Sequence, residues 1–244
     1  NFATALANTA AEPITVSDTF VNVEDLTASD LVKQINRLIN LANAETSSVT
    51  MTIKDASTSN LLLTTGTTIT GAAAGSSIEV QLGNITATDA LLTNLNALGA
   101  QDGISKITAN ITGMTAARID KLGTLNDIDT SSKFEITYTT SGEITLAQAK
   151  TLVDKTTLTA NTTIDFAGPV KGATTDFYNV GTSRLHNNLL AVLGKDVNAP
   201  LKVTDTIEDS NDVTRLNALE DGDGTNSGTT GQITATLAVS ATDA

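Results

Sequence analysis

The sequence predicts an α/β protein, specifically a β/α solenoid of strand–helix repeats of about 28 residues with a parallel sheet. Three observations favour this fold. Short clusters of Thr and branched residues recur along the chain, and amphipathic helical stripes lie between them. Only 3% of residues are aromatic, so a core must be built from thin layers of aliphatic side chains. An all-β sandwich is the alternative, because Thr-rich strands separated by Gly turns also suit sandwiches.

The strand-like clusters are evenly spaced. They begin at residues 49, 78, 107, 134, 163, 201 and 233, so the gaps are 29, 29, 27, 29, 38 and 32 residues. A first strand is expected at 14–16. Parallel strands need a crossover of a dozen or more residues, usually a helix, and this spacing leaves room for one helix in each repeat.

Five segments carry helix signals. In residues 27–42, Thr27 can cap the free backbone N–H groups and Asp30 suits the positive end of the helix dipole. An apolar stripe of Leu31, Ile35 and Leu38 follows at spacings of four and three. The other predicted helices are 88–98, 115–122, 145–155 and 210–219, the last with Val213, Leu216 and Leu219 facing inward.

Two stretches depart from the repeat. Residues 60–77 have no helix signal and are expected to form an extra strand pair or a β-only turn. Residues 168–200 are longer than one repeat and contain the only histidine, which predicts an elaborated insertion. The expected organisation is an N-terminal arm over 1–13 and one repeat domain over 14–244.

The charge balance limits the partners. The formal net charge is −13 and the pI is near 4.3, which disfavours nucleic acid, whose binding requires Lys and Arg at phosphates, and an anionic bilayer. Divalent cations are the natural counter-charge. No apolar run reaches the 18 residues typical of a membrane span, so no membrane insertion is expected. The chain has no Cys, which together with its Thr-rich acidic composition is typical of bacterial extracellular and cell-surface proteins.

One string has the composition of a metal site. In residues 221–228, the oxygens of Asp221, Asp223 and Asn226 lie on a Gly-rich loop, and Ca²⁺ takes six to eight such ligands. The EF-hand pattern fails, because its sixth position is Asn226 and its twelfth is Gln232. A solvated polar turn is the alternative interpretation. Asp127 and Asp129 are a poorer calcium candidate.

Nothing in the sequence indicates catalysis. His186 is not accompanied by an acid–nucleophile pattern, and it is expected to be a packing or hydrogen-bonding residue. We therefore expect neither an enzyme nor a cofactor other than Ca²⁺. Asn84, Asn110 and Asn161 fit the Asn-x-Thr glycosylation pattern.

Several phrases resemble a known group of proteins. They are Ile14–Thr19 (ITVSDT), Ile85–Ala90 (ITATDA), Gly142–Ala149 (GEITLAQA) and Val203–Thr206 (VTDT). These phrases resemble the repeats of very large secreted bacterial cell-surface proteins, including the giant cyanobacterial surface protein needed for swimming, in the style of S-layer proteins and adhesins. The resemblance implies a structural surface role and carries over no catalytic residue. The Gly-Gly-x-Gly-x-Asp calcium repeat of such proteins is absent.

The predicted function is therefore structural. A solenoid has two open sheet edges, and stacking the last strand of one subunit on the first strand of the next generates a non-closing filament. We expect an extracellular, self-assembling subunit or segment of a surface filament, sheath or S-layer, whose partner is itself in a head-to-tail homopolymer or a neighbouring segment of a larger surface protein. The alternative is a ligand-binding segment of a large adhesin, which contacts a glycan or a protein.

Overall fold

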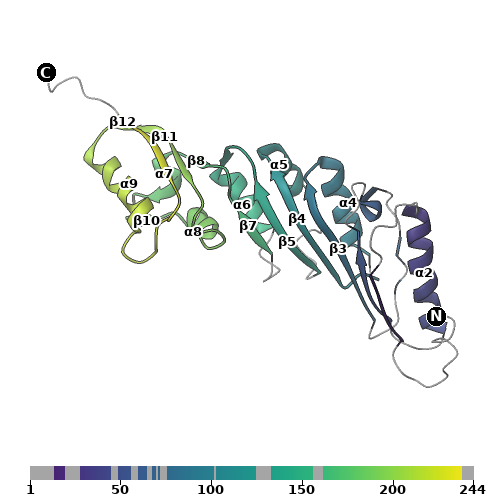
Figure 1. Cartoon of the computed structure of the whole chain (residues 1–244). Coiled ribbons are helices and arrows are strands. Elements are labelled where there is room, and N and C mark those ends of the chain that lie inside the picture. Colours follow the sequence, from purple (N-terminus) through teal and green to yellow (C-terminus); the bar gives the residue numbers. More distant parts are fainter. Residues whose placement is uncertain are drawn as a thin grey trace. The chain divides into compact units, whose positions relative to one another are not determined.

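The computed structural model describes residues 14–19, 28–44, 49–55, 60–64, 68–69, 71, 76–101, 103–124, 133–155 and 162–237 (Figure 1). The predicted arm over 1–13 lies outside these residues, as do Asp127 and Asp129. The chain divides into two compact units: unit 1 comprises Asn1–Asn110, Leu125–Ile136 and Leu158–Asn161, and unit 2 comprises Ile111–Thr124, Thr137–Thr157 and Thr162–Ala244.

Unit 1 contains parallel strands joined by helices. Its elements are β1 (Ile14–Thr19), α2 (Ala28–Ala44), β2 (Val49–Lys54), α3 (Leu61–Thr64), β3 (Ser77–Thr86), α4 (Asp89–Gly99) and the first parts of β4 (Lys106–Met114) and β5 (Phe134–Thr140). Strand β2 pairs in parallel with β1 on one side and with β3 on the other. Helix α3 contacts both α2 and α4.

Unit 2 contains the remaining elements. They are the ends of β4 and β5, then α5 (Ala116–Gly123), β6 (Ile144–Thr145), α6 (Leu146–Asp154), β7 (Thr163–Asp165), β8 (Val170–Gly172), α7 (Thr174–Phe177), β9 (Tyr178–Asn179), β10 (Arg184–Leu185), α8 (Asn187–Leu193), β11 (Leu201–Ile207), α9 (Ser210–Asp221) and β12 (Ile233–Leu237). Strands β6, β8, β11 and β12 form a parallel four-stranded sheet in chain order, whereas β9 and β10 form an antiparallel pair.

The predicted class, a mixed α/β protein with a parallel sheet, is confirmed. In the sheet of unit 1 the strands β1, β2 and β3 are neighbours in this order, so they also follow the order of the chain, and in unit 2 strand β5 pairs in parallel with β7. All eight predicted strands and all five predicted helices coincide with observed elements. The all-β sandwich is wrong for the described residues, because helices alternate with the strands.

Alternation of buried and part-exposed residues builds the core. In β5, Phe134, Ile136 and Tyr138 are almost fully buried, and the residues between them are half-buried. The helices supply the opposing layer through their apolar stripes, as Leu92 and Leu95 do in α4. Because each layer is thin and aliphatic, the core needs few aromatic side chains.

A glycine bend precedes the three helices α4, α5 and α6. Gly83, Gly113 and Gly142 have positive φ angles of 70°, 71° and 75°, a conformation that favours glycine. The chain then reaches a Thr at the helix N-cap, and Thr145 forms a complete capping box with Gln148. The same bend thus occurs before three consecutive helices of the chain.

Two local predictions are wrong. Residues 60–77 contain a short helix, α3, where a strand pair or a β-only turn was expected. At the start of this helix, the Asp55 carboxylate accepts a hydrogen bond from the Leu62 N–H at 2.8 Å. In α9 the predicted inward residue Val213 is 45% exposed, whereas Leu219, also predicted to face inward, is buried together with Ala218.

Candidate functional site

Polar side chains connect neighbouring strands at separations of about one repeat. In unit 1 the Asn110 side chain donates to Asn84 at 2.9 Å, and the Ser77 and Ser105 hydroxyls lie 3.0 Å apart. In unit 2 the Thr137 and Thr163 hydroxyls lie 2.9 Å apart. The sequence separations of these three pairs are 26, 28 and 26 residues. These polar pairs therefore join side chains of consecutive strands across the sheet. Two of the three possible glycosylation residues, Asn84 and Asn110, belong to this set.

Charged residues form similar rows. Lys106 Nζ lies 2.7 Å from Glu135 Oε2 and 4.0 Å from Glu79 Oε1, so that the ammonium group of one strand pairs with a carboxylate on each of the two neighbouring strands. The hydrogen bond to Glu135 raises the pKa of Lys106 above its usual value, against the opposing effect of desolvation. In unit 2, Glu143 takes the central place between Lys171 and Lys202, and the hydrogen bond from Lys202 lowers the pKa of the Glu143 carboxyl.

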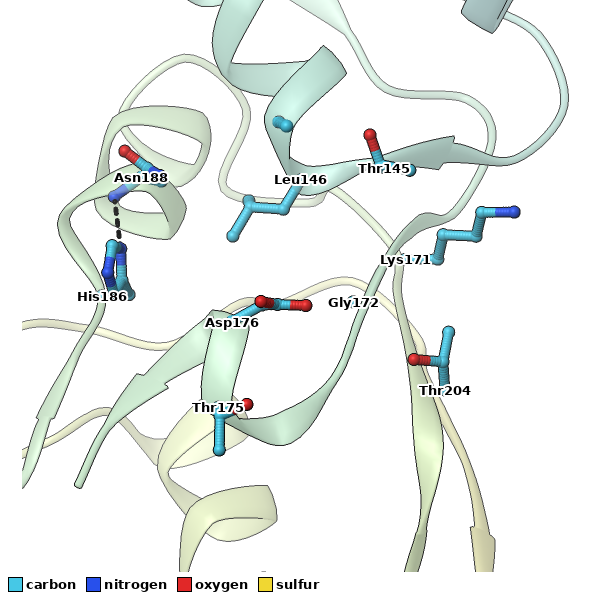
Figure 2. Close-up of a pocket in the computed structure, with 10 residues that line it drawn as sticks. Thr145, Leu146, Lys171, Gly172, Thr175, Asp176, His186, Asn188 and Thr204 are labelled. Carbon is cyan, nitrogen blue, oxygen red and sulfur yellow. Dashed lines mark hydrogen bonds between the residues drawn. The ribbon is translucent and has the colours of Figure 1, made fainter.

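Unit 2 also has an open hollow of about 500 Å³ (Figure 2). Its wall comes from the start of α6, from β8, α7 and β11, and from the start of α8; it includes Thr145, Lys171, Asp176, His186 and Asn188. Figure 2 shows His186 beside Asn188 at one end and Lys171 toward the other. The predicted insertion over 168–200 therefore contributes most of this wall.

The titratable groups of the hollow are engaged in local structure. The His186 imidazole caps α8, because its Nδ1 accepts the Asn188 N–H at 3.3 Å. Asp176 Oδ2 accepts the Ala173 N–H at 2.8 Å at the start of α7. These contacts match the hydrogen-bonding role expected for His186. In the described part of the chain, no hydrogen bond joins this imidazole to a hydroxyl or a carboxylate.

The calcium candidate forms a compact loop after α9. Asp221 is the last residue of α9 and is exposed, whereas the Asp223 side chain is 0% exposed. Asp223 Oδ1 accepts the N–H groups of Thr225 at 3.0 Å and Asn226 at 2.8 Å, and Oδ2 accepts the Leu185 N–H at 2.8 Å. The Asn226 amide donates to both oxygens. The structure therefore brings Asp223 and Asn226 together, with N–H donors around the carboxylate.

These contacts determine the charge state of the loop. Burial of the Asp223 carboxyl opposes ionisation, but the hydrogen bonds from Asn226, Leu185 and Thr225 outweigh it and hold its pKa well below the usual range. The Leu185 contact, between residues 38 apart in sequence, joins the loop to β10. Calcium binding here would have to replace these donors. Within the ranges that the structure describes, no group of three or more His, Cys, Asp or Glu side chains could hold a metal ion.

The sheet edges are the other candidate sites. Strand β12 ends its sheet, and β11 is its neighbour there. Leu237 at the end of β12 is 63% exposed, whereas Leu201 and Val203 on β11 are buried. At the edge of the other sheet, β1 has β2 as its neighbour among the described strands. Both edge strands are parallel to their neighbours and therefore extend the pattern of the sheet.

Over the residues that the structure places, no helix is both long and apolar enough to cross a bilayer. Comparison of the chain with protein-family models, with curated proteins and with solved structures finds no match.

Proposed function

We propose that this chain is a structural extracellular protein, a self-assembling subunit or segment of a surface filament, sheath or S-layer, built as a strand–helix solenoid. The observation that carries the proposal is the repetition of polar pairs between consecutive parallel strands, at separations such as 26 and 28 residues. In a repeat protein each unit contacts its neighbours, so the same contacts recur at the length of the repeat.

The edge strands support self-assembly. An unpaired strand presents a row of N–H and C=O groups that another chain can pair with. Strand β12 combines such an edge with the exposed side chain of Leu237. Adding one subunit's first strand to another's last strand is a heterologous contact, which continues as a filament unless the rotation closes it.

Composition supports the location that we propose. The net charge of −13 and the absence of Cys suit an acidic surface protein that does not depend on disulfides. Calcium at Asp221, Asp223 and Asn226 is retained as part of the proposal, with Ca²⁺ neutralising acidic surfaces where subunits meet.

A ligand-binding segment of a large adhesin is the second candidate. The hollow between α6, β8 and α8 favours it, because Lys171, Asp176 and His186 offer both signs of charge around an open concave surface. A glycan or a polar peptide fits this chemistry. This candidate predicts dispersed single molecules that bind a ligand, and substitution of Lys171 by Ala would then weaken binding without changing the folding of the chain.

Electron microscopy of the purified chain tests the proposal, first with millimolar Ca²⁺ and then after chelation. Ordered fibres or sheets are expected. Loss of the fibres on chelation, together with their loss in an Asp221→Ala variant at millimolar Ca²⁺, would assign calcium to the 221–228 loop. Single dispersed particles under both conditions would refute self-assembly and leave the adhesin candidate.

A further inference from the structure

The first and the last pairs of strands in this chain are built alike. Pro13–Thr19 reads PITVSDT and Pro200–Thr206 reads PLKVTDT, so the two phrases share Pro, Val, Asp and Thr at the same places. Their following strands are also similar: β2 begins VTMTI and β12 is ITATL. This similarity predicts that β1 and β11 have equivalent structural roles.

The structure supports this equivalence through an irregularity of the backbone. In the β1–β2 pair, Thr15 faces Thr50 and Thr19 faces Thr52, so β1 uses four residues where β2 uses two. In the β11–β12 pair, Lys202 faces Thr234 and Thr206 faces Thr236, with the same difference. The bulge thus occurs at the same point of the shared phrase. Bulges are specific features that redirect the chain locally.

The bulge of β11 has a defined partner inside the chain. Asp205, within this bulge, accepts the Thr174 N–H at 2.8 Å and the Thr174 hydroxyl at 2.6 Å. On the same side, β8 pairs with β11 in parallel, with Val170 facing Leu201. The Pro200 carbonyl accepts the Val170 N–H at 2.8 Å. Strand β11 is therefore shaped to receive a short strand that leads directly into a Thr at a helix start.

Strand β1 presents the same phrase at a sheet edge that no other described strand covers, which we call its open edge. Asp18 occupies in β1 the position that Asp205 occupies in β11, and Ile14 corresponds to Leu201. Among the described strands, β1 has a neighbour on the β2 side. Its other edge therefore corresponds to the edge of β11 that β8 covers.

The end of the sequence supplies a segment that suits this edge. Residues 239–244 read VSATDA, which resembles ITATDA of Ile85–Ala90, the phrase that leads into α4 through the N-cap Thr88. They also align with the β8–α7 junction, so that Ala241 and Thr242 take the places of Ala173 and Thr174. Ser240 stands where the junction has Gly172. The sequence thus offers a small-Ala-Thr segment after β12.

We propose that the open edge of β1 binds residues 238–242 of a second copy of this chain, in parallel, as β11 binds β8 and Thr174. This inference rests on the proposed self-assembly and defines its contact. The equivalent register places Ala238 opposite Ile14, Val239 opposite Thr15 and Ser240 opposite Val16. Asp18 then takes the role that Asp205 has in β11 and accepts the N–H and the hydroxyl of Thr242.

Cysteine cross-linking tests the register. The sequence contains no cysteine, so a Thr15→Cys, Val239→Cys double variant is free of competing thiols. Under mild oxidation it should form a ladder of disulfide-linked multimers. The matched control, Thr15→Cys with Thr234→Cys, displaces the second thiol by about 16 Å along the strand, beyond the reach of a disulfide, and should stay monomeric.

The outcomes separate the contact from self-assembly. Fibres without a ladder from the Thr15–Val239 pair, or with a ladder from the control instead, would overturn this contact and leave self-assembly standing. Disulfide-linked pairs without fibres would keep the contact and overturn the filament. Neither fibres nor linked chains would overturn both, and a disulfide within single chains would overturn the choice of a second copy.

Two matched substitutions give an independent readout. Asp205→Asn acts within the chain and should lower the thermal unfolding temperature. Asp18→Asn should leave that temperature unchanged and raise the concentration needed for assembly at least tenfold, which corresponds to about 1.4 kcal/mol. Unchanged assembly of Asp18→Asn would overturn the role of Asp18.

Discussion

Substitution of Gly168 by Ala tests the close stacking of successive bends in unit 2. A Cβ added to Gly168 would collide with the carbonyl oxygen of Gly142, one bend earlier in the chain, and would also press on its carbonyl carbon and nitrogen. The Gly168 N–H points to the buried Thr140 hydroxyl at 3.4 Å. Because the colliding atoms belong to the backbone, no rotation of a side chain relieves the contact. The two bends must separate or one must unfold.

The size of the effect follows from comparing three glycines. A methyl group forced into a packed site typically costs 1–3 kcal/mol, and a backbone collision puts Gly168→Ala at the upper end, about 3 kcal/mol. Gly142→Ala meets no atom but requires a left-handed conformation at φ 75°, which costs about 1–2 kcal/mol. Gly181→Ala is the control, because its nearest atom lies at 3.5 Å and its φ is not positive; it should change stability by less than about 0.5 kcal/mol.

Thermal unfolding followed by far-ultraviolet circular dichroism measures these differences. For a chain of this length, 1 kcal/mol corresponds to about 2–4 °C, so Gly168→Ala should lower the unfolding temperature by about 6–12 °C. The order should be Gly168, then Gly142, then Gly181. If Gly168→Ala unfolds at the same temperature as Gly181→Ala, the two bends do not stack as they do in the structure.

The remaining predictions concern the loop, the charged rows and the core. Asp223→Asn should destabilise the chain at neutral pH. Because the pKa of Asp223 is lowered in the folded state, the carboxylate contributes to stability above the ordinary Asp pKa near 4, and this contribution disappears as the pH falls further. The free energies of urea unfolding of wild type and variant should therefore converge in acid. The raised pKa of Lys106 gives the opposite pH dependence: its contribution to stability is complete below about pH 10 and is lost at higher pH. The stability of Lys106→Met should not show this loss. Leu95→Ala, at a fully buried site of α4, should cost about 3 kcal/mol in urea unfolding, and the half-buried Leu91→Ala less than about 1.5 kcal/mol. Equal costs for the two leucines would contradict the placement of the α4 stripe.

The helices could be predicted because each combines a cap with a stripe. The predicted helix over 88–98 matches α4, in which Thr88 is the N-cap residue and Leu92 and Leu95 are buried. These signals are local: they depend on residues three or four apart. The spacing of the strands then implied parallel pairing, since no short turn joins consecutive strands.

Features that depend on distant residues could not be predicted. Val213 fits the stripe of α9 by spacing, yet the neighbouring elements cover Ala218 and Leu219 and leave Val213 45% exposed. Asp223 has the composition of a calcium ligand, but the sequence does not show that the Leu185 N–H, 38 residues away, reaches its carboxylate. A spacing rule identifies which groups are close in the chain and says nothing about which donors surround them.

The equivalence of β1 and β11 combines both kinds of information. The sequence alone shows that Pro13–Thr19 resembles Pro200–Thr206, but a shared phrase could serve β-propensity in both places. The bulges, which fall between Thr15 and Thr19 and between Lys202 and Thr206, show that the resemblance extends to backbone geometry. In β11 this geometry places Asp205 on Thr174. The carboxylate therefore stabilises the fold at Asp205 and, by our proposal, the contact between subunits at Asp18. Asp205→Asn should lower the unfolding temperature, whereas Asp18→Asn should weaken assembly.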